Sequence, residues 1–477
     1  MHRPAKRGVL RGGRNGGQGQ NRDETGKGRD VPHDHPLRRR FGARRARGGG
    51  RPPGNVMDKV CREWTIPLAA ESTAIAQSHW YNARVQASQN DSLDTAISHL
   101  PALDGLRGVA ILLVLALHFG VAADFALRAP GALTRWIERI CYAGWSGVDL
   151  FFVLSGFLIT SILLATKDQA GYFRRFYARR ALRIFPLYYT ALVLAFFVVP
   201  AVFRDRASDL VSNGAGTQAW FWTYTANIGM VLGTANAALL AHFWTLAIEE
   251  QYYVFWPSVV KLTSRRGLIA VSLLLIVGAL TLRFYAVSTT LGWPWAYRFT
   301  LARVDGFGVG ALVALLASDS RSRDRLLRMA PYGLAATLAA LAVMFLLVPR
   351  FYPTDSTVVT MGQSLLAIAS GWLIATALRP RGSGWFCSPA LRWLGKYSYG
   401  IYVWHWPLQR LLLILFAARW PPVQGSFLAG LAFAALGVVG SCGLGWTSYV
   451  VLERRFLLLK RLVAYAPSAS EKPAAAI

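Results

Sequence analysis

LDGLRGVAILLVLALHF, at residues 103–119, starts as a polar turn and continues as an apolar run long enough to cross a membrane as a helix. It carries Arg107 near its start and His118 near its end. An ionisable side chain at the bilayer centre costs about 3 kcal/mol or more, so such residues are rare and mark functional sites. The stretch therefore predicts a membrane helix with a functional face.

Similar apolar runs recur along most of the chain. With 54% hydrophobic residues, 17 Trp and 25 Phe among 477 residues, the chain has more apolar surface than a soluble domain of this length buries. A span needs roughly 17 to 25 residues. The sequence therefore predicts an all-α polytopic membrane protein with about ten spans, at 104–122, 147–165, 184–203, 243–261, 268–288, 299–317, 330–348, 360–378, 397–417 and 427–452.

The basic residues predict the orientation of these spans. The segment WFWTYTANIGMVLG, at 220–233, is short and holds Thr, Asn and Gly where a lipid-facing helix would hold Leu or Val. If this segment is re-entrant or interfacial, the basic clusters that follow the second, fourth, sixth, eighth and tenth spans share one side. The positive-inside rule makes that side the cytoplasm, with both termini there.

Composition also divides the chain into four parts. Residues 1–56 form a basic tail, with 15 Lys and Arg against 4 Asp and Glu up to residue 53, which predicts disorder. A polar segment follows at 57–99, then the membrane domain at 100–456 and a cytoplasmic tail at 457–477. The tail could bind anionic lipid, but no recognition fold accompanies it, so a nucleic-acid partner is not expected. The composition break makes Met57 an alternative start, with the tail a gene-model extension.

Two classes of site are not indicated. The four cysteines are scattered, without a CxxC pair or a histidine cluster, so neither a metal site nor a disulfide framework is expected. No glycine-rich nucleotide-binding pattern stands between a strand and a helix. No bound cofactor is therefore expected.

The spacing of Arg107 and His118 places them on nearly the same helix face at two depths of the membrane. Eleven residues return a helix almost to the same face, with roughly 16 Å between the two positions along the axis. An arginine at the cytoplasmic mouth suits a polyanion, and a histidine buried beyond it suits proton transfer. The alternatives are that Arg107 snorkels to the interface and that His118 is a satisfied packing residue.

Further ionisable residues fall at matching depths. In YFRRFYARRALRIFPLYY, at 172–189, Arg180 and Arg183 share a helix face and predict a phosphate clamp, although a pure topology signal is the alternative. In HFWTLAIEEQYYVFWP, at 242–257, Glu249 could orient the histidine or pair structurally with an arginine. The remaining candidates are Asp149 as an assistant to the histidine, and Glu250, Arg303, Asp305, Tyr399 and His405 in supporting roles, with His405 favoured as a packing residue.

Five blocks in order carry a family resemblance: LDGLRGVAILLVLALH, GVDLFFVLSGFLI, RRALRIFPLYY, FWTLAIEEQYYVFWP and LGKYSYGIYVWHWPL. Together they resemble the acyltransferase 3 family of bacterial integral-membrane O-acyltransferases, over residues 100 to about 456. The resemblance implies a multi-pass protein of the bacterial inner membrane. It also implies an acyl-CoA donor, commonly acetyl-CoA, and a sugar hydroxyl as acceptor. Arg107 and His118 match the family's signature, and Arg180, Arg183, Glu249 and Glu250 match further family positions.

The resemblance and the residues together predict a mechanism. We expect Arg107, Arg180 and Arg183 to hold the CoA phosphates, and His118 to act as general base with Glu249 or Asp149 assisting; a covalent acyl-histidine is a variant. Some relatives add a hydrolase-like domain after the last helix, whereas only 21 residues follow Phe456, so we expect the membrane domain or a separate protein to finish the transfer. A transporter or flippase of a glycolipid or polyanionic solute is the alternative function. The acceptor, the acyl chain and the oligomeric state stay open.

Overall fold

A computed structural model describes residues 100–123, 131–203, 215–348, 351–379, 384–419 and 427–463. Helices account for nearly all of these residues and no strand occurs among them, so the all-α prediction is confirmed. The predicted tail at 1–56, the polar segment at 57–99 and the end of the C-terminal tail lie outside the described residues.

The helices follow one another closely along the chain. The α-helices are α4 Pro101–Leu115, α6 Ala132–Tyr142, α7 Ser146–Thr166, α8 Tyr172–Val193, α9 Val199–Val202, α11 Ala215–Trp222, α12 Ala226–Val231, α13 Trp244–Leu262, α14 Arg265–Ser288, α15 Gly292–Arg298, α16 Val304–Ala317, α17 Ser320–Leu347, α18 Gln363–Ala377, α19 Pro389–Arg419, α20 Phe427–Ser448 and α21 Arg454–Leu458. Four π turns extend or interrupt them: η1 Ala116–Gly120, η3 Leu194–Val198, η7 Val358–Gly362 and η9 Tyr449–Glu453. Short 3₁₀ turns include η5 Ala238–Phe243 and η8 Trp385–Cys387.

Seven helical segments of the described chain are long and apolar enough to cross a membrane: Pro101–Gly120, Ala132–Thr166, Tyr172–Val202, Arg265–Ser288, Ser320–Leu347, Val358–Ala377 and Phe427–Leu458. Each corresponds to one of the ten predicted spans. The other three predicted spans form helices α13, α16 and α19, and of these only α16 is recognised, as a shorter apolar helix. A count of ten spans and the cytoplasmic termini therefore stay predictions.

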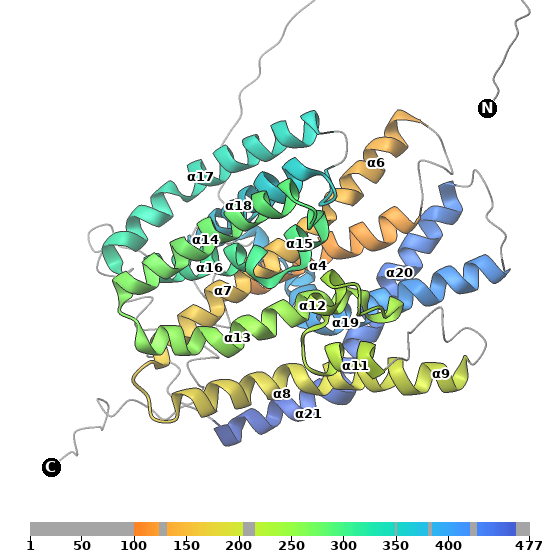
Figure 1. Cartoon of the computed structure of the whole chain (residues 1–477), viewed down its shortest axis with the longest axis horizontal. Coiled ribbons are helices and arrows are strands. Elements are labelled where there is room, and N and C mark those ends of the chain that lie inside the picture. The colour runs from red at the N-terminus through yellow and green to blue at the C-terminus, as the bar shows by residue number, and fades with distance from the viewer. Residues whose placement is uncertain are drawn as a thin grey trace, which may run out of the picture. The chain divides into compact units, whose positions relative to one another are not determined.

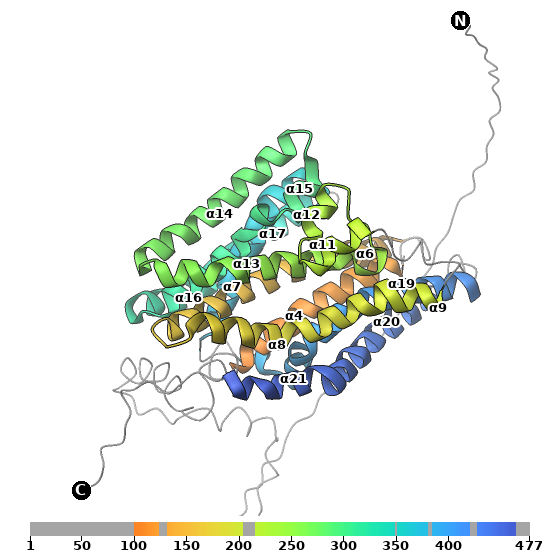
Figure 2. The ribbon, with the colours of Figure 1, turned by 60° about the horizontal axis from the view of Figure 1, so that its bottom comes forward.

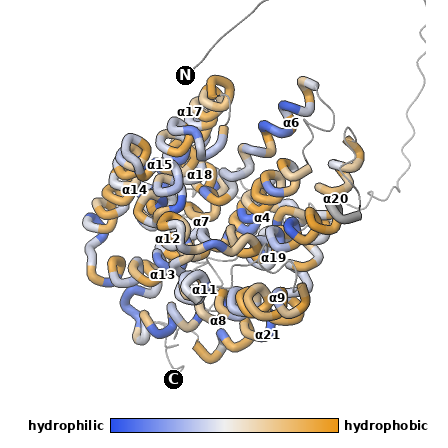
Figure 3. Tube along the Cα trace, turned by 45° about the vertical axis from the view of Figure 1, so that its right-hand side comes forward, coloured by the Kyte–Doolittle hydropathy of each residue, from blue (hydrophilic) through white to orange (hydrophobic). Residues whose placement is uncertain are grey.

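Helices α4 and α7 lie at the centre, with α14 and α17 on one side and α8 and α21 on the opposite side (Figures 1 and 2). Segment Ala132–Thr166 contains α7, and 78% of the residues in its most apolar window are buried inside the protein. In the corresponding window of Ser320–Leu347 the buried share is 11%. The outer helices α14, α17 and α20 expose long apolar side chains and are largely orange in Figure 3. Because an apolar surface that faces outward is stable in lipid, these helices form the membrane-facing layer.

Glycines bring the central helices into backbone contact. A Cβ atom on Gly105 of α4 would lie 1.8 Å from the carbonyl oxygen of Phe386, and one on Gly108 would lie 2.1 Å from that of Leu391. From the other side, a Cβ on Gly395 of α19 would lie 1.7 Å from the carbonyl oxygen of Asp104. Small residues are what lets two membrane helices approach this closely. The glycines of the LDGLRG and LGKYSYG blocks thus set the separation of α4 and α19.

The same device joins α7 to α16. A Cβ on Gly156 would lie 2.3 Å from the carbonyl oxygen of Phe307, and one on Gly310 would lie 2.1 Å from that of Val153. Small residues at 155–156 in the sequence favour the close approach of helices or of a ligand chain. In the structure, Gly156 is the contact that allows α16, a short helix, to lie against α7.

Segment 220–233 packs inside the protein. It forms the short helices α11 and α12, neither of which is long enough to cross a membrane, as the sequence analysis expected. The polar residue Asn227 is fully buried and donates to the carbonyl of Arg298 at 3.2 Å and to the hydroxyl of Thr300 at 2.8 Å. The polar residues of this segment therefore face partners within the protein.

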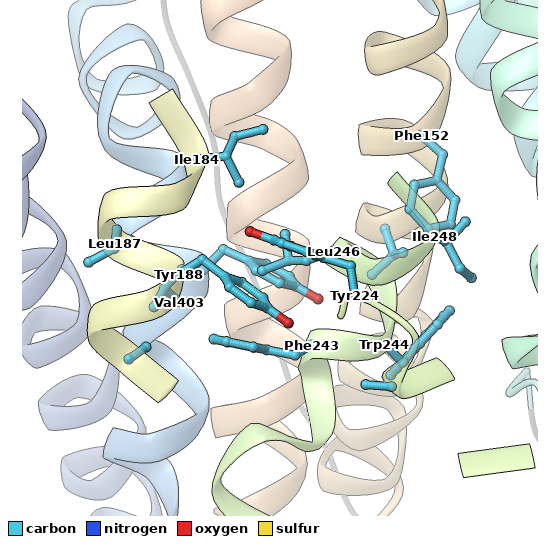
Figure 4. Packing of buried hydrophobic residues seen from close by; sticks show 14 of the residues in the cluster. Phe152, Ile184, Leu187, Tyr188, Tyr224, Phe243, Trp244, Leu246, Ile248 and Val403 are labelled. Atoms are coloured by element: carbon cyan, nitrogen blue, oxygen red, sulfur yellow. The ribbon is translucent and has the colours of Figure 1, made fainter. Parts of the chain in front are cut away.

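Aromatic rings hold α8 against this segment (Figure 4). Tyr188 stacks on Tyr224 with ring centroids 4.0 Å apart and on Phe243 at 4.9 Å. Its hydroxyl donates to the carbonyl of Phe221 at 2.7 Å, so the buried phenol is satisfied. This packing fixes the face that α8 turns towards α13.

The first span ends in a π turn. Helix α4 is regular to Leu115 and continues as η1, which contains His118. A π turn carries an extra residue per turn and changes the rotation of everything after it. His118 therefore does not keep the helical phase relative to Arg107 that eleven residues of uninterrupted α-helix would give.

Candidate functional site

A pocket opens between α4, α7, α8, α13 and α19. Its charged lining combines Arg107 of α4, Arg180 and Arg183 of α8, and Glu249 and Glu250 of α13. Five predicted site residues, separated by up to 143 positions in sequence, thus line one cavity. Predicted site residue Tyr399 of α19 also lines it, and its hydroxyl donates to the carbonyl of Ile184 at 2.7 Å.

The arginine side of the pocket is held in place by neighbouring side chains. Arg107 donates to the carboxylate of Asp104, one turn earlier on α4, at 2.9 Å. The guanidinium of Arg180 lies over the ring of Tyr253 at 5.0 Å, in cation–π geometry. Asp104 belongs to the quoted LDGLRG block, and its three-residue spacing from Arg107 was the signal that could have identified the pair. Two of the three arginines that line the pocket are thus held by a neighbouring side chain.

The carboxylate side of the pocket involves two hydroxyl residues, Ser155 and Tyr253, that are not among the predicted site residues. Glu249 accepts hydrogen bonds from the hydroxyls of Ser155 and Tyr253. The Tyr253 hydroxyl also lies 3.0 Å from Ser155 Oγ. Glu250 is mostly buried, and its Oε1 has no hydrogen-bond partner in the described part of the chain. The two glutamates therefore differ, since one is bound by hydroxyls and the other keeps an available acceptor.

Thr245 and Tyr402 close the pocket on the side away from the arginines. Their hydroxyls lie 2.6 Å apart, and the Tyr402 hydroxyl donates to the carbonyl of His242 at 3.2 Å. The Tyr402 ring lies 5.2 Å from that of His405 and 5.4 Å from that of His242. Neither Thr245 nor Tyr402 was selected from sequence, since hydroxyl residues among aromatics carry no spacing signal. They form the wall between the pocket and a group of histidines.

His118 lies beyond this wall. Its Nδ1 bonds to the carbonyl of Val114 at 2.8 Å, and its ring lies 4.8 Å from the rings of both His405 and Trp406. The side chain of Gln409 donates to the backbone carbonyl of His118. The histidine is thus oriented by backbone and aromatic contacts from α19.

The predicted carboxylate assistants lie elsewhere. Glu249 is bound in the arginine pocket, and Asp149 of α7 forms an ion pair with Arg303 at 3.0 Å. Neither forms a hydrogen bond with His118 among the described residues. The sequence analysis grouped these residues because their predicted depths in the membrane match. Depth does not specify how each helix is rotated about its axis, and this rotation directs the side chains to different partners.

Arg303 and Asp305, predicted as supporting residues, take part in buried ion pairs. Arg303 is held by Asp149 and lies over the rings of Phe152 and Tyr297. Asp305 accepts from Arg283 of α14 at 2.7 Å, and this arginine is fully buried. Such pairs are costly to break because the remaining charge stays buried. They tie α7, α14 and α16 together behind the pocket.

Metal coordination is not supported by the arrangement. No group of three or more His, Cys, Asp or Glu side chains in the described ranges is placed to hold a metal ion.

Comparison with known proteins extends these observations. A family model described as "Acyltransferase domain" matches residues 100–446. The chain is 30% identical to the peptidoglycan O-acetyltransferase OatA of Listeria monocytogenes over 326 residues, which cover 65% of this chain and 49% of the relative. It is also 30% identical over 373 residues to a Bacillus subtilis protein named "Putative peptidoglycan O-acetyltransferase YrhL", covering 75% and 54% of the two chains. The chain spans about half the length of these curated relatives, and no solved structure matches it at a significant level.

Proposed function

Because this chain belongs to the acyltransferase domain family, we propose that it transfers an acetyl group from acetyl-CoA to a sugar hydroxyl on an exported glycan or glycoside. The observation that carries the proposal is the pocket in which three arginines converge, with a histidine group beyond its far wall. The names of the relatives support O-acetylation of a glycan.

Arg107, Arg180 and Arg183 bind the phosphates of the donor. The CoA head carries several negative charges on phosphate oxygens, and the planar guanidinium fork binds such oxygens bidentately. Asp104 keeps Arg107 extended along the pocket wall. Basic clusters on one side of the spans support an opening to the cytoplasm of a bacterial cell, where acetyl-CoA is available.

The thioester end of the donor points towards His118. The pantetheine arm lies along Ser155 and Tyr399, and the acetyl group reaches the wall formed by Thr245 and Tyr402. The acceptor hydroxyl enters from the opposite side of the membrane. This route requires the wall to open, since His118 is not among the residues that line the pocket.

His118 acts as general base. Its Nδ1 hydrogen is donated to Val114, so Nε2 keeps a lone pair. Nε2 removes the proton of the acceptor hydroxyl, the oxygen forms a bond to the carbonyl carbon, and the carbon–sulfur bond breaks. The proton then passes to the CoA thiolate. Glu249 keeps Ser155 and Tyr253 in place along the donor, and Asp149 holds Arg303.

The test follows radiolabelled acetyl-CoA in membranes from cells that express the chain. His118→Asn is the sharpest variant, because an asparagine amide keeps the bond to Val114 and removes Nε2. We expect label in a carbohydrate fraction with the wild type, and a loss of about 10²-fold or more with the variant. Wild-type rates in His118→Asn would refute the general base. A wild type that moves a glycolipid between leaflets without label transfer would identify a transporter.

A further inference from the structure

Three histidines from distant parts of the chain meet beyond the pocket wall. His118 comes from η1, His242 from η5 and His405 from α19. The ring of His405 lies 4.8 Å from that of His118 and 5.1 Å from that of His242, so His405 is the middle member. His405 is fully buried and His242 is 5% exposed. We call these three residues the imidazole cluster.

Backbone carbonyls fix the tautomer of each ring. Nδ1 of His118 faces the carbonyl of Val114, Nδ1 of His405 faces that of Tyr402 at 2.5 Å, and Nε2 of His242 faces that of Val403 at 3.2 Å. A carbonyl oxygen only accepts, so each of these nitrogens carries the ring hydrogen. The other nitrogen of each neutral ring is then an acceptor.

Two of the three remaining nitrogens are buried and unpaired among the described residues. Nε2 of His405 and Nδ1 of His242 are buried without a hydrogen bond in the described part of the chain. A native structure rarely leaves buried polar atoms unpaired, and each such atom calls for an explanation. Three neutral imidazoles whose free nitrogens all accept cannot bond to one another.

One added proton relieves this conflict for one pair of neighbouring rings. A protonated nitrogen becomes a donor to the free acceptor of the neighbouring ring, and a charge-assisted bond of this kind is about twice as strong as a neutral one. The centroid distances allow such a bond after small ring rotations. The cluster is therefore complementary to a single extra proton, which is the species formed when a base at His118 accepts one.

The surroundings make a shared proton favourable. No carboxylate of the described residues bonds to His118, and Arg410, whose guanidinium lies over Trp406 at 4.7 Å, acts electrostatically against a positive charge on that ring. Spreading the charge over two rings reduces this repulsion. Trp406 and Phe243 pack on the cluster, with the Trp406 ring 4.8 Å from that of His118 and the Phe243 ring 4.7 Å from that of His242.

We propose that His405 is a positioning residue that accepts, through Nε2, a hydrogen bond from protonated His118, while the ring of His242 packs against His405. The proposal rests on the proposed function, in which His118 removes the proton of the acceptor hydroxyl. That proton is held between Nε2 of His118 and Nε2 of His405 while the carbon–oxygen bond forms. When the carbon–sulfur bond breaks, the proton leaves His118 for the thiolate sulfur, and both rings are neutral again.

The test compares two substitutions of His405. His405→Asn keeps the donor to the Tyr402 carbonyl and lacks the Nε2 acceptor, whereas His405→Ala leaves a space that free imidazole can fill. Leu411→Ala, on an exposed position of the same helix, is the matched control. We expect kcat of His405→Asn to fall on the order of 10²-fold with an unchanged KM for acetyl-CoA. Added imidazole should restore part of the activity of His405→Ala.

Three outcomes would overturn the proposal: wild-type kcat in His405→Asn, a higher KM with unchanged kcat, or no rescue of folded His405→Ala by imidazole. The last would indicate a packing role. If His118→Asn stays fully active, His118 is not the general base and the proposed function is wrong on that point. If His118 is essential and His405 is dispensable, only the inference about His405 is wrong.

A second measurement does not depend on the acceptor. Nitrogen NMR of histidine-labelled protein reports the protonation of each ring. We expect the signals of His118 and His405 to shift together in one protonation step in the wild type, and the coupling to vanish in His405→Asn. Independent titration of the two rings in the wild type would contradict the shared proton. Arg410 is the other charged group that acts on His118, so Arg410→Gln serves as the electrostatic control.

Discussion

The contact between α4 and α19 can be tested at a single glycine. A Cβ atom at Gly395 would lie 1.7 Å from the carbonyl oxygen of Asp104, whereas real Cβ contacts are essentially never shorter than 3.0 Å. Gly395→Ala must therefore move the two backbones apart by more than 1 Å, because the obstacle is a carbonyl and not a flexible side chain. Helix α4 carries Arg107 and α19 carries His405, so the movement changes both halves of the site.

The expected cost follows from this geometry. Overpacking a well-packed core costs about 1–3 kcal/mol, and a displacement of about 1 Å in a catalytic arrangement can cost roughly 10²-fold in rate. The matched control is Gly443→Ala on α20, where an added Cβ meets nothing within 4 Å. Alanine there is neutral or stabilising by up to about 1 kcal/mol through helix propensity.

The assay combines thermal unfolding of the detergent-solubilised protein with the acetyl-transfer measurement on the same samples. We expect Gly395→Ala to unfold at a lower temperature than the wild type and to lose more activity than its stability loss explains, while Gly443→Ala matches the wild type in both. A Gly395→Ala protein as stable and as active as the control would refute the argument that backbone contact sets the helix separation.

Three further predictions follow from side-chain contacts. Arg183→Ala should raise KM for acetyl-CoA with a smaller effect on kcat, and Arg183→Lys should recover only part of the affinity because a lysine cannot bind bidentately. Asp305→Ala should destabilise the fold by about 3–5 kcal/mol, since it leaves Arg283 charged and buried, whereas Arg283→Met combined with Asp305→Leu should recover most of that loss. At the start of α17, Ser322 donates its backbone N–H and hydroxyl to Asp319, which lowers the pKa of that carboxyl. A carboxyl with a lower pKa in the folded state stabilises above its unfolded pKa and loses that contribution as pH falls through the folded value, so Asp319→Asn should flatten the stability profile below about pH 4.

Each of these has a result that would contradict it. For Arg183, equal KM values in wild type and Arg183→Ala, measured by steady-state transfer, would remove it from donor binding. For the buried pair, a double variant no more stable than Asp305→Ala in thermal unfolding would show that the charge left behind is not the cause. For Asp319, parallel pH profiles of wild type and Asp319→Asn would show that its hydrogen bonds do not affect stability.

The apolar pattern predicted the spans well where helices face lipid. Outer helices such as α14 and α17 are continuous apolar runs, because lipid contact on most sides requires it. It also predicted spans at 243–261 and 397–417, but α13 and α19 are not among the seven long apolar segments of the described chain; both carry polar residues of the candidate site, among them Glu249, Glu250 and His405. These polar residues lower the mean hydropathy of both helices.

The candidate site was only partly predictable for a related reason. The two α8 arginines were found from spacing on one helix, which local geometry determines. The hydroxyls that bind Glu249 come from Ser155 of another helix and Tyr253 of its own, and the wall of Thr245 and Tyr402 joins two helices. Contacts between helices depend on how each helix is rotated about its axis, and this rotation cannot be predicted from composition.

The sequence by itself determined the membrane class, the all-α architecture, the family and the residue types available for acyl transfer, because these depend on local composition and on motifs within single segments. Only the tertiary structure decided which charged groups are partners. It brings His118 against His405, because a π turn at the end of α4 and glycine contacts between α4 and α19 set the rotation and separation of these two helices. It also joins Asp149 to Arg303, because glycine contacts hold α7 against α16.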